Sequence, residues 1–263
     1  MESLRAMSIA NENDVELSIL IPVYNEIGTI EAIIERVLWL CTDLNWNAEL
    51  LVVDDGSVDG TAEKMQRFAT EPRVKLLTHS INQGKGAAIR TALAQATKEL
   101  TVIQDADLEY DPQQIASLIE AMNARKGDVI YGSRVLGARA QMSAQRRNIY
   151  ALGVVTLNLA VRVLYGRWLT DEATCYKLFR TNDLLRMELE CQGFEFCPEV
   201  TAKAIRLGLL IVEIPISYNP RLTTEGKKIR LMDAFIAIRT LWKFRRWSPS
   251  PSKLRSLFHA QLP

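Results

Sequence analysis

The stretch TVIQDADLEYDP, residues 101–112, is an apolar run that ends abruptly in carboxylates. Asp105, Asp107, Glu109 and Asp111 alternate, so an extended chain would point all four side chains the same way. Four like charges on one face repel one another. A bound cation would relieve that repulsion, because Mg²⁺ and Mn²⁺ take oxygen ligands and often bridge to phosphates. Taken alone, the stretch could equally be a solvated strand end.

Around this stretch, apolar runs alternate with segments of helical spacing. Runs rich in branched residues predict buried strands at 17–23, 48–55, 74–79, 99–105 and 128–134. The segments between them predict helices at 29–40, 59–69, 86–97 and 111–124. Asp59 is the expected N-cap of the second helix, and Pro112 is expected in the first turn of the fourth. The alternation predicts an α/β fold with a mostly parallel sheet flanked by helices.

The second half of the chain is less regular. Residues 137–148 are polar and basic, which predicts a mobile loop, and TDEATCYKLFR (170–180) predicts a turn. The remaining elements are predicted as helices at about 149–165 and 197–208, a strand at 209–218 and a basic loop at 219–230. The chain is therefore divided into a polar N-terminal extension (1–16), a main domain (17–230) and a C-terminal amphipathic helix with a loose tail (231–263).

Composition narrows the class of protein. With 263 residues and 48% hydrophobic content, the chain can bury a large core. A net charge of +1 gives no field that would attract nucleic acid. The four cysteines lack metal-ligand spacing and predict reduced, cytoplasmic thiols, and with two histidines the carboxylates must carry most metal or acid–base chemistry. Neither a signal peptide nor a membrane span is expected.

Three polar clusters follow predicted strands: PVYNE (22–26), DDGS (54–57) and DADLE (105–109). In parallel sheets, ligands bind beyond the carboxyl ends of the strands. The three clusters are therefore expected to share one cleft, which favours a ligand and cation site over a solvated strand end.

Five motifs in order carry a resemblance to a known family: PVYNE, VVDDGSVDGT, NQGKGAAIRTAL, DADLEYDP and YGSR. Together they resemble the family-2 glycosyltransferases, in the branch of dolichyl-phosphate mannose synthases and other polyprenyl-phosphate hexosyltransferases. The resemblance covers residues 17–230. It implies a GT-A fold, a nucleotide-sugar donor, a divalent cation (Mg²⁺ or Mn²⁺) and an inverting transfer.

The resemblance implies roles for single residues. Asp105 and Asp107 match the DxD motif and, with Glu109, would hold the cation that stabilises the leaving diphosphate. Asp107, Arg134 and Asp171 are the expected catalytic residues. The expected donor contacts are Pro22, Tyr24, Glu26, Val53, Asp55, Lys85, Asp105, Ala106, Asp107, Glu109, Arg134, Arg221 and Lys227. Contacts to an acceptor phosphate are expected from Arg134 and Arg147.

Several of these residues have a plain structural alternative. Lys85, in a glycine-rich loop before a helix, would touch the donor phosphate or only support the cleft. Asp54 would contact the ligand or hold a turn, and Asp111 is expected to cap a helix. Asp171 would be a base for a hydroxyl acceptor or the ion-pair partner of an arginine. A phosphate acceptor is already anionic and needs little proton removal.

The pattern of the final helix suits either of two environments, a membrane surface or the protein core. Its predicted apolar face consists of Leu231, Phe235, Ile238 and Trp242, beside a basic stripe of Arg239, Lys243 and Arg246. This pattern suits a helix lying on anionic lipid, although packing on the core is the commoner arrangement. We expect a peripheral protein on the cytoplasmic face of a membrane.

The expected function is transfer of a hexose, mannose or glucose, from GDP-mannose or UDP-glucose to a polyprenyl or dolichyl phosphate. One alternative is the same fold acting on a hydroxyl acceptor, a glycolipid or a cell-surface polysaccharide. Another is a non-catalytic protein that binds nucleotide-sugars.

Overall fold

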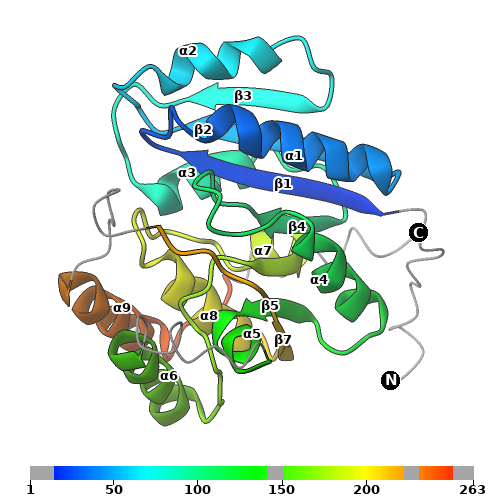
Figure 1. The fold of residues 1–263 in the computed structure, drawn as a ribbon. Coiled ribbons are helices and arrows are strands. Elements are labelled where there is room, and N and C mark those ends of the chain that lie inside the picture. The colour runs from blue at the N-terminus through cyan, green and yellow to red at the C-terminus, as the bar shows by residue number, and fades with distance from the viewer. Residues whose placement is uncertain (1–14, 141–150, 222–230, 251–263) are drawn as a thin grey trace.

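Seven strands form one sheet in the computed structural model, which describes residues 15–140, 151–221 and 231–250. Helices cover both faces of the sheet (Figure 1). The strand order is β3-β2-β1-β4-β6-β5-β7, and β6 runs antiparallel to both of its neighbours. The predicted α/β class with a mostly parallel sheet is therefore confirmed.

The strands are β1 Glu16–Val23, β2 Asn47–Asp54, β3 Val74–Thr78, β4 Leu100–Ile103, β5 Val129–Ser133, β6 Lys177–Arg180 and β7 Ile211–Pro215. The helices are α1 Ile30–Asp43, α2 Thr61–Met65, the 3₁₀ turn η1 Gln66–Phe68, α3 Lys85–Leu93, α4 Gln114–Asn123, α5 Arg134–Ala140, α6 Ala151–Tyr165, α7 Thr181–Arg186, α8 Phe196–Arg206 and α9 Leu231–Phe244.

Alternate residues of the central strands enter two separate cores. In β1, Ile19 and Ile21 pack under α1 and α4, whereas Leu20 packs under α3 on the other face. The second core continues through α7 and α8 to Leu241 and Phe244 of α9. Burial on both faces explains why these strands are continuous apolar runs. It also makes α9 part of the same core as the sheet.

The sequence prediction missed β6 and α7. Both lie in or directly after the segment 170–180, which was predicted to be a turn. β6 has four residues and begins with the fully buried Lys177, so neither its length nor its polarity indicates a strand. It is inserted between β4 and β5, with Leu178 opposite Val102 and Ile130.

Several predicted boundaries were wrong. α5 occupies 134–140, where a loop was predicted from residue 137, and residues 141–150 lie outside the described part. α3 ends at Leu93, and α4 begins two residues after Pro112. Asp59 is not the N-cap of α2: Gly60 takes that position with φ +94°, while the Asp59 carboxylate accepts the amides of Thr61 and Ile27.

The chain beyond β4 is not extended, contrary to the simplest interpretation of the alternating carboxylates. β4 ends at Ile103, the chain turns from Ala106 onwards, and Leu108 has a left-handed φ of +61°. The carboxylates therefore point to different partners. Asp111 is exposed and accepts the amide of Gln113, just ahead of α4.

Candidate active site

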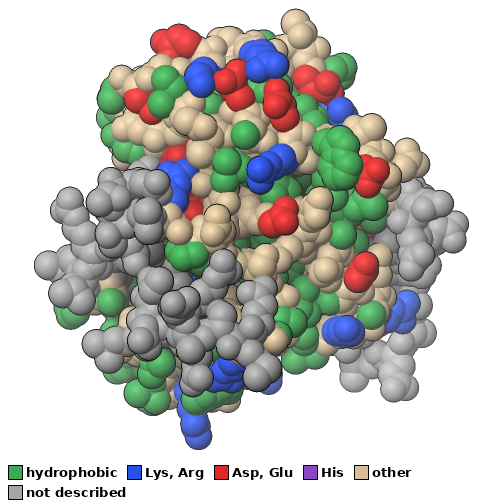
Figure 2. Space-filling view, in the orientation of Figure 1, with side chains coloured by type: hydrophobic (Ala, Val, Ile, Leu, Met, Phe, Trp, Pro, Cys, Tyr) green, Lys and Arg blue, Asp and Glu red, His purple; other side chains and the backbone are tan. Residues whose placement is uncertain are grey.

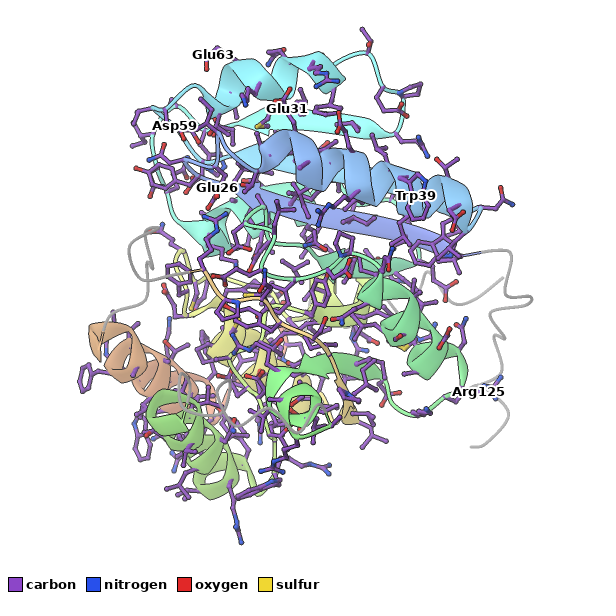
Figure 3. All side chains as sticks on the ribbon, in the orientation of Figure 1. Glu26, Glu31, Trp39, Asp59, Glu63 and Arg125 are labelled. Carbon is purple, nitrogen blue, oxygen red and sulfur yellow. The ribbon has the colours of Figure 1, made fainter. Side chains whose placement is uncertain are left out.

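The candidate site lies beyond the carboxyl ends of β1, β2, β4 and β5. Figure 3 shows Glu26, which follows β1, at the same end of the sheet as Asp59, which follows β2. The parallel register places the ends of β1 and β2 side by side, with Val23 opposite Asp54. The three polar clusters consequently follow neighbouring strands, in the order β2, β1 and β4.

Asp105 is held by a lysine from the glycine-rich loop. The Lys85 ammonium lies 2.5 Å from Asp105 Oδ1 and 3.0 Å from Cys175 Sγ. Both charged side chains are largely buried, with 16% of Lys85 and 12% of Asp105 exposed. Burial alone would lower the pKa of Lys85, but the charge of Asp105, the neighbouring thiols of Cys175 and Cys197 and the hydrogen bond to Asp105 together outweigh burial and hold that pKa well above its usual range. Lys85 therefore keeps its positive charge at neutral pH.

Asp107 is the electrostatically stressed member of the cluster. Burial, followed by the charges of Asp105 and Glu109, raises the pKa of Asp107 to about 7. Its Oδ1 accepts the Glu109 amide at 3.1 Å. A carboxylate in this setting is stabilised by a positive ligand, which is the chemical basis for a cation site at this position.

Glu109 turns away from Asp107 towards the segment that follows β7. Its carboxylate accepts the Tyr218 hydroxyl and, at 2.9 Å, the backbone amide of Arg221. The Arg221 guanidinium donates to the Asp107 carbonyl at 2.8 Å and pairs with Glu26 at 2.6 Å. Arg221 thus joins the β1 and β4 ends. Glu109 serves this contact instead of standing beside Asp105 and Asp107.

Arg134 and Asp171 form a two-pronged buried ion pair. Nε and Nη2 of Arg134 each lie 2.7 Å from an Asp171 oxygen, and the Arg134 amide donates to the same carboxylate at 2.9 Å. Asp171 is fully buried. Its own amide and that of Thr170 donate to the Glu213 carboxylate on β7, and the Arg134 guanidinium lies 5.2 Å from the centre of the Tyr218 ring. The arginine is therefore fixed in direction.

Asp55 organises the glycine-rich loop. Its carboxylate accepts the amides of Gln83 and Gly84 at 2.9 and 2.7 Å, and it lies 2.6 Å from Nδ1 of His79. It is 2% exposed, so the protein itself surrounds this group, which was predicted to contact the nucleotide-sugar donor. Asp54 is also buried and accepts the amide of Ser57, as a turn residue does.

The other predicted site residues differ in accessibility. Pro22, near the end of β1, and Tyr24, directly after β1, are half-buried, whereas Val53 and Ala106 are buried. Arg147 and Lys227, predicted to bind acceptor and donor phosphates, lie outside the described residues.

Sequence reasoning did not identify four residues that hold the site together: His79, Cys175, Glu213 and Tyr218. His79 was one of only two histidines, and its position directly after β3 was a usable signal. The other three depend on contacts between distant segments, which no local pattern encodes.

The predicted three-carboxylate metal site is not preassembled. Among residues 15–140, 151–221 and 231–250 there is no group of three or more His, Cys, Asp or Glu side chains arranged to hold a metal ion. Asp105 and Asp107 still fit a divalent cation, because they are hard oxygen donors and because burial, followed by the charge of Asp105, raises the pKa of Asp107. Glu109 does not fit, since its oxygens bind Tyr218 and the Arg221 amide.

A second surface lies on α6 and α9, which pack against each other and against α8. Val155, Leu159 and Val163 form an exposed stripe along α6. On α9, Phe235 and Trp242 are exposed, while Leu241 and Phe244 enter the core. Figure 2 shows hydrophobic side chains in this region with Lys and Arg close by. α9 therefore packs on the core and still presents apolar residues to the outside.

Trp168, which lies just after α6, and Trp242 on α9 are both exposed, and each ring has an arginine guanidinium close to its centre. Arg162 lies 4.9 Å from the Trp168 ring centre, and Arg245 lies 3.7 Å from that of Trp242. None of the helices in the described part of the chain has the length and apolar character needed to span a bilayer.

Comparison with known proteins places the chain among enzymes that transfer sugars. The family model described as "Glycosyl transferase family 2" matches residues 18–184. The chain is 31% identical over 217 residues to an undecaprenyl-phosphate mannosyltransferase of Micrococcus luteus, covering 79% of this chain and 85% of that protein. It is 27% identical over 234 residues to a dolichol-phosphate mannosyltransferase of Pyrococcus furiosus, covering 89% of this chain but only 64% of that longer protein.

Solved structures agree on the fold. The crystal structure of glucosyl-3-phosphoglycerate synthase from Mycobacterium tuberculosis with Mn²⁺, uridine diphosphate and glucosyl-3-phosphoglycerate matches with a TM-score of 0.60 at 19% identity. The match covers 89% of this chain and 81% of that one. It confirms the expected GT-A-like architecture.

Proposed function

Because the chain belongs to glycosyl transferase family 2, we propose that it is an inverting hexosyltransferase that acts on a polyprenyl phosphate. It takes mannose or glucose from GDP-mannose or UDP-glucose. The acceptor phosphate oxygen attacks the anomeric carbon, and the nucleoside diphosphate leaves from the opposite side. Two curated relatives named for undecaprenyl- or dolichol-phosphate mannosyl transfer support this acceptor class.

The pairing of Asp171 with Arg134 is the observation that carries the choice of acceptor. Asp171 is fully buried, and three hydrogen bonds from Arg134 occupy its carboxylate. A general base must reach the proton that it removes, and this carboxylate is committed to the arginine. A hydroxyl acceptor needs such a base, whereas a phosphate acceptor is already ionised. The locked carboxylate therefore favours the phosphate.

Asp105 and Asp107 are proposed to hold the divalent cation. When bound, the cation neutralises charge that develops on the leaving diphosphate. Mn²⁺ in the complex of the structural neighbour supports a divalent ion. Arg221, anchored at Glu26 and at the Asp107 carbonyl, is proposed to grip the donor diphosphate together with Lys227.

Arg134 is proposed to contact the acceptor phosphate together with Arg147. Planar guanidinium groups suit phosphate because they donate two parallel hydrogen bonds. Asp171 and the Tyr218 ring fix the direction of Arg134 before any ligand arrives, so little ordering is needed on binding.

The α6–α9 surface is proposed to rest on the membrane that carries the acceptor. Its exposed apolar residues Leu159, Phe235 and Trp242 suit the acyl boundary, and Arg162 and Arg245, stacked on tryptophans, suit anionic headgroups. On this proposal the protein is peripheral, on the cytoplasmic face.

Transfer of radiolabelled sugar into an organic-extractable product tests the proposal. Purified full-length protein is incubated with polyprenyl phosphate in detergent, Mn²⁺ or Mg²⁺, and GDP-mannose or UDP-glucose in parallel. An acid-labile lipid product from one donor, absent with Asp107→Asn and retained with the surface variant Lys64→Gln, is the expected result. Metal-dependent donor turnover without any lipid product would instead support a hydroxyl acceptor.

A further inference from the structure

The loop that carries Lys85 is clamped from both sides. On one side, the Asp55 carboxylate accepts the amides of Gln83 and Gly84. On the other, the Gln192 carbonyl accepts the Ala87 amide at 2.9 Å, and a Cβ on Gly84 would stand 2.5 Å from the same oxygen. The backbone at Lys85 is therefore held in one place relative to β2 and to the segment before α8.

The side chain of Lys85 uses this fixed base to reach the end of β4. Its ammonium touches Asp105 Oδ1 at 2.5 Å and the Cys175 sulfur at 3.0 Å, and the ring centre of Phe194 lies 5.9 Å away. A lysine that is 16% exposed and wedged between these groups is not a solvated surface charge. It occupies one face of the carboxylate that the family resemblance assigns to the cation.

The charge in the site is distributed unequally. Among the ion pairs of the described residues, Asp105 has an ammonium partner but Asp107 has none. A divalent cation that arrives alone meets one carboxylate that is paired with an ammonium and one that has no such partner among the described residues. Asp105 offers its full negative charge to the cation only if Lys85 moves to another anion.

We propose that Lys85 is the internal counter-ion of the cation site, holding Asp105 when no divalent cation is bound and competing with that cation for the carboxylate. The inference rests on the proposed function, which supplies a cation at Asp105 and Asp107 and a diphosphate beside it. The diphosphate gives Lys85 a replacement partner. The divalent cation therefore binds weakly alone and tightly together with the nucleoside diphosphate.

Mn²⁺ titration followed by electron paramagnetic resonance tests this without any acceptor or turnover. The full chain is titrated alone and with GDP or UDP. We expect Lys85→Met to bind Mn²⁺ alone about tenfold more tightly than the unaltered protein, a typical size for coupling between two sites. The additional tightening by GDP or UDP should shrink correspondingly. Lys85→Arg, which keeps the charge, and Lys64→Met, which removes an exposed lysine paired with Glu31, should behave like the unaltered protein.

The outcomes separate this inference from the function on which it rests. If the unaltered protein binds Mn²⁺ with GDP or UDP but Lys85→Met does not bind Mn²⁺ alone more tightly, Lys85 is only structural and the inference fails by itself. If the unaltered protein binds no Mn²⁺ even with GDP or UDP, the proposed cation fails and this inference fails with it. Lys85→Gln, which can still hydrogen-bond Asp105, replaces the methionine variant if urea unfolding shows that the latter is unfolded, with the same expectation.

Discussion

Replacement of Asp171 by asparagine separates a structural anchor from a catalytic base. The substitution keeps the shape of the side chain but removes the charge that faces Arg134. In the native protein that guanidinium is 10% exposed, and it donates through Nε and Nη2 to the two oxygens of Asp171. An asparagine can accept only one of these bonds and turns an NH₂ group towards the other donor.

The expected decrease in the free energy of unfolding follows from the hydrogen bonds that Asp171→Asn removes. Hydrogen bonds to charged groups contribute about 1.5 kcal/mol or more each, so the loss of one bond and the weakening of its neighbour amount to about 3 kcal/mol. Breaking a buried pair by removing one partner costs about 3–5 kcal/mol, which agrees. Arg134→Met should cost a similar amount. The double variant should cost about 2 kcal/mol less than the sum, because it leaves no unpaired buried charge.

Urea unfolding at pH 7 measures these differences in the free energy of unfolding. The matched control is Glu99→Gln, which breaks an exposed ion pair with Arg180 (48% and 38% exposed) and should cost no more than about 0.5 kcal/mol. If Asp171→Asn unfolded at the native urea midpoint but abolished sugar transfer, Asp171 would be a reactive group. The reasoning that assigns a phosphate acceptor would then be refuted.

Further predictions concern pH, the loop and the membrane surface. Burial among carboxylates raises the pKa of Asp107 from 3.8 to about 7, so the folded state binds the carboxyl proton of Asp107 more tightly than the unfolded state does. The stability that this proton contributes is fully present below pH 3.8 and should be lost as pH rises through about 7. Urea unfolding across that range should show a free energy of unfolding that falls as pH rises, with a smaller slope in Asp107→Asn. Burial also raises the pKa of Glu172 to about 7, so Glu172→Gln should reduce the slope too. Unchanged slopes in the two variants would contradict both pKa shifts. Gly84→Ala, which forces a side chain onto φ +98° and within 2.5 Å of a backbone oxygen, should lower the unfolding free energy by about 2 kcal/mol or more, and a native melting temperature would contradict this. Leu159→Glu on α6 should reduce co-sedimentation with phosphatidylglycerol vesicles, whereas Trp39→Glu, exposed on α1, should not; equal binding by both variants would remove α6 from the membrane contact.

The extent to which the fold could be predicted depended on how each strand is buried. The β1, β2 and β4 runs are apolar because helices cover both faces of the sheet, so their existence and their shared carboxyl edge could be predicted. β6 could not be predicted in the same way. Its first residue, Lys177, is buried, and its ammonium is satisfied by the carbonyls of Glu172 and Thr174. A lysine in a four-residue segment indicates a surface turn unless those contacts are known.

In the candidate site, too, some residues could be predicted from the sequence and others could not. The carboxylates at the strand ends could be identified because their position follows from the parallel sheet. Their partners could not, because Lys85 meets Asp105 across 20 residues and Arg221 meets Glu26 across 195. Loop conformation decides these pairings, and the periodicity of the sequence carries no information about it.

The antiparallel strand β6 also sets an order for folding. β1 to β4 lie within residues 16–103 and pair only with one another and with β6, so this half can form as soon as its own residues are available. β5 ends at residue 133, yet its sheet partners β6 and β7 begin at residues 177 and 211. Long-range pairing of this kind is slow to form, because the loop entropy must be overcome first. We therefore expect the edge formed by β5 and β7 to be the last part of the sheet to assemble during synthesis, leaving the β4 edge open to aggregation until residue 180 has emerged.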